Sequence, residues 1–452
     1  MLAASCFFYM AFVPKFILIL VALILIDYAA GILIENSSGR RRKIFLATSL
    51  FANVGMLGFF KYFNFFNTNL AAIAHLIGWN YSINGLAIVL PIGLSFHTFQ
   101  SMSYTIEVYR GNFKAERSLL HFALYVLFYP QLVAGPIERP QNLLHQFHED
   151  HRFDWHNFRS GLELMAFGLF KKVVIADRVA TLVNAVYNHP QNYAGLQLLL
   201  ATYFFAVQIY CDFSGYSDIA RGAARVMGIE LMSNFNRPYL ASSLDDFWRR
   251  WHISLSTWFR DYVYFPLGGN RVSTGRLCLN LLAVFLISGF WHGASWTFVA
   301  WGAVHGLGFV FCILTQDLRT QIAGKLGLTG SRFSKVAGTI LTFNFVCLSW
   351  IFFRATDLSQ ALLIISRIAS SFTISGNFHA GLSMGQFVLS LILMFALLTA
   401  EFLHRHPPQW LVPARELKWV RWSAYYVFTI AFVLLVLLSP TQAAQTFIYF
   451  QF

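Results

Sequence analysis

Long apolar runs, separated by short basic stretches, extend over most of the chain. A helix needs about 20 predominantly apolar residues to cross a bilayer, and runs close to that length recur along the whole sequence. Together with amphipathic and broken segments, they predict an all-α polytopic membrane protein of ten or eleven membrane segments, organised as one domain over residues 1–452. The ordinary spans are expected at residues 16–34, 44–62, 84–106, 119–134, 195–211, 277–290, 295–314, 336–353, 386–403 and 422–439.

Two stretches break this pattern of apolar spans. Residues 161–186 place charged side chains among apolar positions, which predicts an amphipathic helix on the membrane surface or packed at its edge. Residues 245–266 are too charged for a lipid-facing span, so they predict broken or re-entrant backbone that is shielded by protein. At the start, the apolar run at residues 2–13 is about half as long as a span and ends at Pro14. The sequence leaves open whether this short start is natural.

The distribution of basic residues predicts the orientation of the chain in the membrane. Lysine and arginine gather at residues 40–43, 319–335 and 405–421, which the positive-inside rule assigns to the cytoplasm. The loop at residues 67–83 has neither lysine nor arginine, so it should lie outside. No charged residue follows Arg421, so the tail after Ser439 is also expected outside.

Composition agrees with a membrane protein. The 452 residues are 57% hydrophobic and 12% charged, whereas a soluble domain carries about 25% charged residues. The mean hydropathy is +0.56. The net charge of +13 does not require a nucleic-acid partner, because the basic residues lie in short loops between apolar segments. The five cysteines show no Cys-x-x-Cys or Cys/His ligand spacing, so the sequence predicts neither a disulfide framework nor a metal site.

Residues 245–308 concentrate the candidate chemistry. Ionisable groups in a bilayer cost about 2.5–3.5 kcal/mol each on insertion scales, so they usually line a cavity or a reaction path. His252 and His292 each follow a tryptophan, and desolvation beside such a ring would keep the imidazole neutral and able to accept a proton. His292 is the stronger candidate for a general base, and Gly289 and Gly293 on either side of it are expected to allow close backbone approach.

The other polar residues admit a structural and a functional interpretation. His252 either orients the acceptor, assists proton transfer or stabilises an oxyanion, or it is a structural hydrogen-bonding residue. For His305 and His97 the structural role is favoured. Asp212, Ser214 and Asp218 are expected to make polar contacts between helices, because no Gly-x-Ser-x-Gly elbow surrounds the serine.

The charges between residues 245 and 261 are nearly balanced in sign. Because unpaired buried charges are prohibitive, they predict a paired network that shapes the cavity. Arg249 and Arg250 could instead hold the phosphates of a nucleotide donor. The members of this set are Asp245, Asp246, Arg249, Arg250, Arg260 and Asp261.

Several motifs occur together and in order between about residues 83 and 310. They are residues 91–96 (PIGLSF) with 104–111, then 128–136 (FYPQLVAGP), 212–218 (DFSGYSD), 234–239, 247–260 (FWRRWHISLSTWFR), 267–271 (LGGNR) and 290–293 (FWHG). In this combination the sequence resembles the membrane-bound O-acyltransferase (MBOAT) superfamily. Within it, the sequence resembles the alginate O-acetyltransferase AlgI branch, which is related to DltB.

The resemblance implies a fold and an activity. The fold would be a multi-helix MBOAT funnel with a polar centre that is open to substrates from both faces. His292 in FWHG matches the invariant active-site histidine, and His252 in RRWHISLS matches the second functional histidine of this branch. The implied donor is acetyl-CoA in the cytoplasm, and the implied location is the bacterial inner membrane. An AlgJ/AlgX-like acetyltransferase would be the partner that completes transfer to an exported polysaccharide such as alginate.

Other functions stay open from the sequence. The acceptor could be another cell-envelope molecule of lipid, teichoic acid or peptidoglycan type. A small-anion transporter is a more distant reading, because such folds often repeat a broken helix in two halves and this sequence shows no such symmetry.

Overall fold

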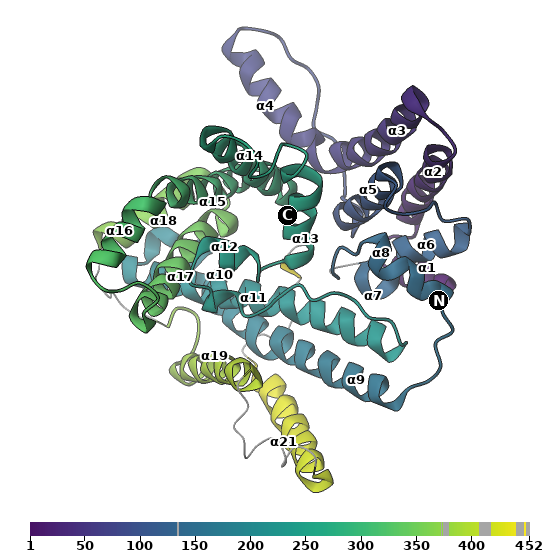
Figure 1. Cartoon of the computed structure of the whole chain (residues 1–452). Helices are drawn as coiled ribbons and strands as arrows, with labels where there is room; N and C mark the ends of the chain where they lie inside the picture. Colours follow the sequence, from purple (N-terminus) through teal and green to yellow (C-terminus); the bar gives the residue numbers. More distant parts are fainter. Residues whose placement is uncertain (133–134, 372, 374–378, 406–416, 440–446, 449–452) are drawn as a thin grey trace.

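The computed structural model describes residues 1–132, 135–371, 373, 379–405, 417–439 and 447–448, and the regular structure in these residues is helical (Figure 1). The first half contains α1 (Leu2–Met10), η1 (Pro14–Phe16), α2 (Ile17–Glu35), α3 (Gly39–Leu57), η2 (Gly58–Tyr62), α4 (Phe63–Leu76), α5 (Leu94–Arg110), α6 (Leu119–Leu127), α7 (Tyr129–Leu132), α8 (Pro140–Leu143), η3 (Leu144–His148), α9 (Trp155–Leu169), η4 (Phe170–Ala176), α10 (Asp177–Asn188), η5 (Pro190–Asn192) and α11 (Gly195–Val226). The second half contains η6 (Pro238–Leu240), α12 (Leu244–Trp248), α13 (Ile253–Phe259), η7 (Arg260–Tyr264), α14 (Thr274–His292), α15 (Trp296–Leu314), α16 (Gln316–Lys325), α17 (Arg332–Arg354), α18 (Leu358–Ser370), α19 (Met384–Arg405) and α21 (Lys418–Leu437).

Within the described residues, eight helical segments are long and apolar enough to cross a membrane. They confirm an all-helical multi-pass membrane protein, but the expected ten or eleven membrane segments exceed this number. The eight segments are residues 14–35, 39–76, 195–226, 274–292, 296–314, 332–354, 384–403 and 418–437.

Two of the predicted spans are wrong because the backbone is broken inside them. The expected span at 84–106 becomes helical only at Leu94, where α5 starts after Gly93 in the left-handed region at φ +76°. A Cβ on Gly93 would lie 2.3 Å from the carbonyl oxygen of Leu132, so both the conformation and the space favour glycine. The expected span at 119–134 ends after nine residues, and the extended ψ of Phe128 (108°) turns the chain into the short α7.

The predicted surface helix at 161–186 is also corrected. This region forms α9, η4 and α10, and its lysines are buried against α11 rather than facing solvent. Lys171 lies 2.6 Å from Asp218, and Lys172 lies 2.6 Å from Asp212. α9 and α11 approach so closely that a Cβ on Gly168 would lie 2.6 Å from the carbonyl oxygen of Gly215. The charges are therefore paired inside the protein, and they confirm the expected interhelical role of the 212–218 motif.

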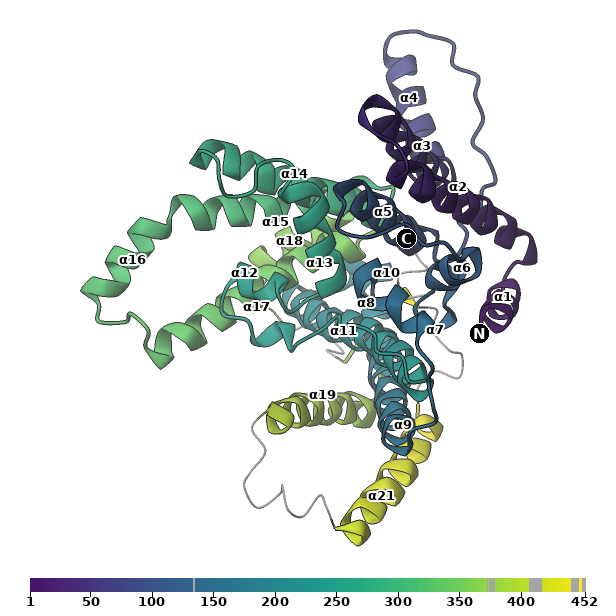
Figure 2. The same ribbon diagram turned by 45° about the vertical axis from the view of Figure 1, so that its right-hand side comes forward.

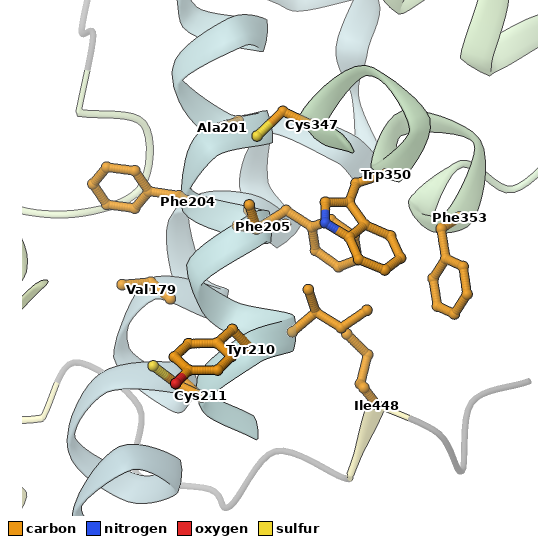
Figure 3. Packing of buried hydrophobic residues seen from close by; sticks show 14 of the residues in the cluster. Val179, Ala201, Phe204, Phe205, Tyr210, Cys211, Cys347, Trp350, Phe353 and Ile448 are labelled. Carbon is orange, nitrogen blue, oxygen red and sulfur yellow. The ribbon is translucent and has the colours of Figure 1, made fainter. Parts of the chain in front are cut away.

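The buried side chains form two large clusters. The second-half cluster joins α15, α17 and α18 to α10 and α11 of the first half. Figure 3 shows Trp350 and Phe353 of α17 on the side of α11 that carries Phe205. Ile448, one of the last described residues, also belongs to it. The first-half cluster joins α2, α5, α6 and α8 with parts of α13 and α14. Figures 1 and 2 place α4 at one side of these clusters and α19 with α21 at the opposite side.

The central stretch confirms the prediction of broken backbone at 245–266. α12 ends at Trp248, a short turn follows, and α13 and the π-helical η7 continue from Ile253. Trp251 belongs to the second-half cluster, whereas Leu255 and Trp258 belong to the first-half cluster. The turn between α12 and α13 therefore lies where the two clusters meet.

Candidate active site

His292 is the last residue of α14 and is buried, with 5% of its surface exposed. Its ring lies among three aromatic side chains, with centroid distances of 4.9 Å to Trp291, 5.1 Å to Trp301 and 5.3 Å to Phe353. Trp301 and Phe353 come from α15 and α17. The side chain thus stands at a helix end but inside an aromatic enclosure built by three helices.

A lysine from a distant part of the chain binds the end of this helix. The last four carbonyl groups of a helix have no intrahelical donor. Lys61 of η2 donates to the carbonyls of Trp291 and His292, each at 2.8 Å. The hydroxyl of Tyr62 donates to the carbonyl of Phe290 at 2.9 Å, and its ring stacks on that of Phe290. A cation at a helix C-terminus also interacts favourably with the helix dipole.

Glycines on both sides of His292 allow α15 to pack against this end of α14. A Cβ on Gly289 would lie 2.3 Å from the carbonyl oxygen of Phe298, and one on Gly293 would lie 2.1 Å from the Phe298 ring. These distances confirm the expected close approach at the two glycines, and they explain how Trp301 comes near His292.

His252 is held in a different way. It precedes α13 with φ 44° and ψ 55°, a left-handed conformation that is uncommon outside glycine. Asn234 fixes the turn: its carbonyl accepts from the N–H of Ile253 at 3.0 Å, and its side-chain oxygen accepts from the N–H of Ser254 at 3.2 Å. The imidazole is 1% exposed and lies edge-on to Phe213 at a centroid distance of 4.7 Å.

Trp291 brings the two histidines together. Its ring centroid lies 4.9 Å from that of His292 and 6.5 Å from that of His252. His252, Lys61 and His305 are all close enough to His292 to interact with it electrostatically. The two Trp-His pairs, 40 residues apart in the sequence, therefore share one buried site.

The site is closed in this conformation. Both imidazoles are almost fully buried, so among the described residues no opening reaches them. A cavity of about 640 Å³ lies nearby and is lined by Ile253 and Leu255 of α13 and by Val284 and Ser288 of α14. Ser288 is one helical turn from His292. Substrate access to the histidine consequently requires side chains between this cavity and His292 to move.

The predicted pairing of charges is present, but the Arg249–Asp245 pair is exposed rather than buried, and the Arg250–Asp246 pair does not line this cavity. Arg249 pairs with Asp245 at 2.8 Å, and Arg250 pairs with Asp246 at 2.7 Å. Of the two candidate donor-binding residues, Arg249 lines the cavity, as does Arg260, whereas Arg250 is not among its lining residues. Arg249 and Arg250, which the sequence offers equally as donor-binding residues, therefore differ in the structure, because only Arg249 lines the cavity.

Of the two remaining histidines, His305 makes a structural contact, whereas neither ring nitrogen of His97 has a hydrogen-bond partner among the described residues. The Nε2 atom of His305 and the hydroxyl of Ser349 are 2.9 Å apart, which links α15 to α17. Its ring also lies 4.9 Å from that of Trp301, so His305 is a neighbour of the enclosure around His292. His97 is buried on α5.

The sequence did not identify Lys61 or Asn234 as parts of the site. Lys61 offered a signal, because it is an isolated lysine in a predicted apolar span, and such residues are often functional. Asn234 lies in one of the recognised motifs, but its hydrogen bonds to residues 253 and 254 depend on the folded turn.

Comparison with known proteins identifies the class. Residues 115–356 match the family described as MBOAT, membrane-bound O-acyltransferase. The chain belongs to this family and is a multi-pass membrane acyltransferase.

Named relatives show which members of this family the chain is similar to. The chain is 32% identical to the peptidoglycan O-acetyltransferase of Helicobacter pylori, over 99% of this chain and 90% of the relative. It is 35% identical to the "probable alginate O-acetylase AlgI" of Pseudomonas putida, over 100% of this chain and 94% of the relative. A teichoic acid D-alanyltransferase of Streptococcus thermophilus is 30% identical over 60% of this chain and 70% of its own length.

Proposed function

We propose that the protein takes an acetyl group from acetyl-CoA at the cytoplasmic face of the bacterial inner membrane and passes it outward for O-acetylation of a cell-envelope polysaccharide. His292 is the general base and His252 assists it. The observation that carries this proposal is the convergence of both histidines on Trp291 inside a membrane protein of the acyltransferase family.

The cavity is the proposed entrance for the donor. It is lined by Leu281 in the half of α14 that follows its N-terminal end and by Phe309 in the half of α15 that precedes its C-terminal end. Basic residues at 271–276 and 319–335 flank these same helix ends, which supports a cytoplasmic position. Arg249 and Arg260 at its mouth offer charge-assisted hydrogen bonds to the phosphates of the donor.

The chemical step transfers the acetyl group from the sulfur of the thioester to the oxygen of an acceptor hydroxyl. His292 removes the proton from an acceptor hydroxyl, and the oxygen attacks the carbonyl carbon of the thioester. The resulting oxyanion is stabilised by hydrogen-bond donors, for which His252 is the candidate. When the C–S bond breaks, the thiolate leaves as CoA and takes the proton back from His292. The products are an O-acetyl ester and free CoA.

The acceptor is a polysaccharide of the cell envelope. A relative named for alginate and another named for peptidoglycan both align over nearly the whole chain, so both acceptors are candidates. The hydroxyl that attacks the thioester belongs to an AlgJ/AlgX-like partner, which then passes the acetyl group to the polysaccharide, the final acceptor, outside the membrane.

The test uses the purified protein in lipid nanodiscs with acetyl-CoA labelled in the acetyl group. We expect release of free CoA in the presence of acceptor and its loss in His292→Gln. Intact acetyl-CoA under all conditions would contradict the enzyme assignment. In cells, deletion of the gene should lower the O-acetyl content of either peptidoglycan or exported polysaccharide, and whichever pool responds identifies the acceptor.

A further inference from the structure

A cluster of three potential metal ligands lies apart from the histidines of the active site. Glu116 lies in the link between α5 and α6, His121 lies in the first turn of α6, and His148 ends η3. Their ligand atoms all lie within 4.8 Å of one another. The sequence does not predict this set as a metal site, because its members come from separate segments and show no ligand spacing.

Local contacts hold the carboxylate in place. The N–H of Ser118 donates to Oε1 of Glu116 at 2.8 Å, and the N–H of Glu116 itself donates to the hydroxyl of Tyr104 at 2.9 Å. The other oxygen, Oε2, lies 2.7 Å from Nε2 of His148. One carboxylate oxygen is therefore anchored by the backbone, while the second is directed toward the histidines.

The unsatisfied group in this cluster is His121. Its Nδ1 atom is buried and has no hydrogen-bond partner among the described residues. The ring lies at a centroid distance of 4.1 Å from that of His148. A buried polar atom without a partner calls for a ligand such as a water or an ion. Two imidazoles and a carboxylate form a donor set that zinc enzymes use, with a fourth position open to water.

We propose that Glu116, His121 and His148 bind one divalent transition-metal ion of the zinc type. Zinc ligands lie about 2.0–2.2 Å from the ion, which places tetrahedral donor atoms roughly 3.3 Å apart. The present spacing, from 2.7 Å up to 4.8 Å, requires small side-chain rotations to reach that geometry. The ion replaces the contact between Glu116 and His148 and takes one ring nitrogen of each histidine as a ligand.

The position of the cluster defines the role of the ion. A polar cavity of about 800 Å³ is lined by Glu107 and Asn112, from the end of α5 and the link after it, and by Gln141 and Asn142 of α8. In the sequence, Glu116 comes a few residues after the wall formed by Glu107 and Asn112, and η3 begins directly after α8, which forms the other wall. The metal thus ties the two walls of this cavity together at one end and acts as a structural brace.

The test measures metal binding by the full-length protein, purified through a tag without histidine and treated with chelator. Co²⁺ is added first and followed by its visible absorption, and Zn²⁺ is then used to displace it. We expect one ion per chain. The variants Glu116→Gln, His121→Gln and His148→Gln should each weaken binding by at least about 100-fold, since even outer partners of metal sites contribute 10–100-fold.

The matched control is His145→Gln, which removes a neighbouring exposed histidine of η3 that faces Glu149 at 4.0 Å. It should keep the wild-type affinity. Zn²⁺ should raise the thermal unfolding midpoint of the wild type and of this control, but not of the three ligand variants. If the wild type binds no ion, or if any of the three variants binds as well as the wild type, the proposed triad is wrong. Acyl transfer is measured separately, so this result does not depend on the proposed function.

Discussion

The segments that carry His292 and His252 hold their imidazole side chains in different ways. His292 ends a regular apolar helix, and its backbone is satisfied from outside by Lys61, which lies 231 residues earlier in the chain. His252 lies in a strained turn whose hydrogen bonds come from Asn234, only about 20 residues away. The first segment depends on how two distant parts of the fold pack together, whereas the second depends mainly on its own loop.

This difference predicts how each segment responds to change. Loss of a contact at His292 should disturb the position of the helix end relative to η2. Loss of a contact at His252 should instead relax a backbone conformation that costs of order 1–3 kcal/mol. Both rings meet at Trp291, so we expect the activity to require the two kinds of support at once.

The largest effect is expected from His292→Ala. Removing the proposed general base should lower acyl transfer by about 10²–10⁴-fold, because general-base help typically contributes that much. The O-acetyl content of the cell envelope, measured in a strain that carries only the variant, checks this. Membrane levels and thermal unfolding of the variant serve as controls, and near-normal acetylation at a normal protein level would contradict the assigned role.

His252→Gly separates the ring from the backbone at the second segment. Glycine adopts positive φ without the steric cost of a side chain, which offsets part of the packing lost with the buried ring, so the variant should still fold. If the ring stabilises the oxyanion, transfer should still fall by about 10²-fold, with a measurable residual rate. Unchanged activity in a stable His252→Gly variant would show that only the turn matters.

Lys61→Met tests the external support of the helix end. It keeps an unbranched side chain but removes two charge-assisted hydrogen bonds, of the kind worth about 1.5–3 kcal/mol each. We expect a lower thermal unfolding midpoint together with slower acyl transfer, because His292 loses its anchor. The matched control is Lys43→Met at an exposed position of α3, which should change neither quantity. Equal stability of the two variants would disprove the capping role.

The smallest effect is expected from Asn234→Ala. It removes one side-chain acceptor from the turn but leaves the backbone hydrogen bond to Ile253, so about 1 kcal/mol of stability should be lost. Thermal unfolding measures this loss, and Asn234→Asp should lose at least as much, because it places a carboxylate at a position that is 1% exposed. If Asn234→Ala reduces activity as severely as His252→Gly, the turn is more dependent on this residue than the hydrogen bonds indicate.

The sequence predicted well those features that depend on local pattern. The apolar spans around 277–290 and 295–314, the broken backbone at 245–266 and the pairing of its charges all follow from hydropathy and charge along the chain. Both candidate histidines were identified because polar groups are conspicuous in apolar surroundings. The close approach at Gly289 and Gly293 was also predicted, and the structure confirms it.

The features that the sequence missed depend on contacts between distant segments. Lys171 and Lys172 look like the polar face of a surface helix until their partners on α11 are known. The predicted span at 84–106 failed because a left-handed glycine fits closely against Leu132, which hydropathy does not register. Lys61 was missed for the same reason, since the carbonyls that it binds belong to α14.

The central claim is that His292 acts as a base in the transfer step, and His292→Gln tests it most directly. Glutamine retains a hydrogen-bond donor and acceptor but cannot take up a proton near neutral pH. Single-turnover transfer from labelled acetyl-CoA should be measured with purified wild type and variant of equal thermal stability. The account predicts that His292→Gln loses at least about 100-fold in rate, as His292→Ala does. A rate within a few-fold of the wild type would contradict it and would make His292 a hydrogen-bonding residue of the fold.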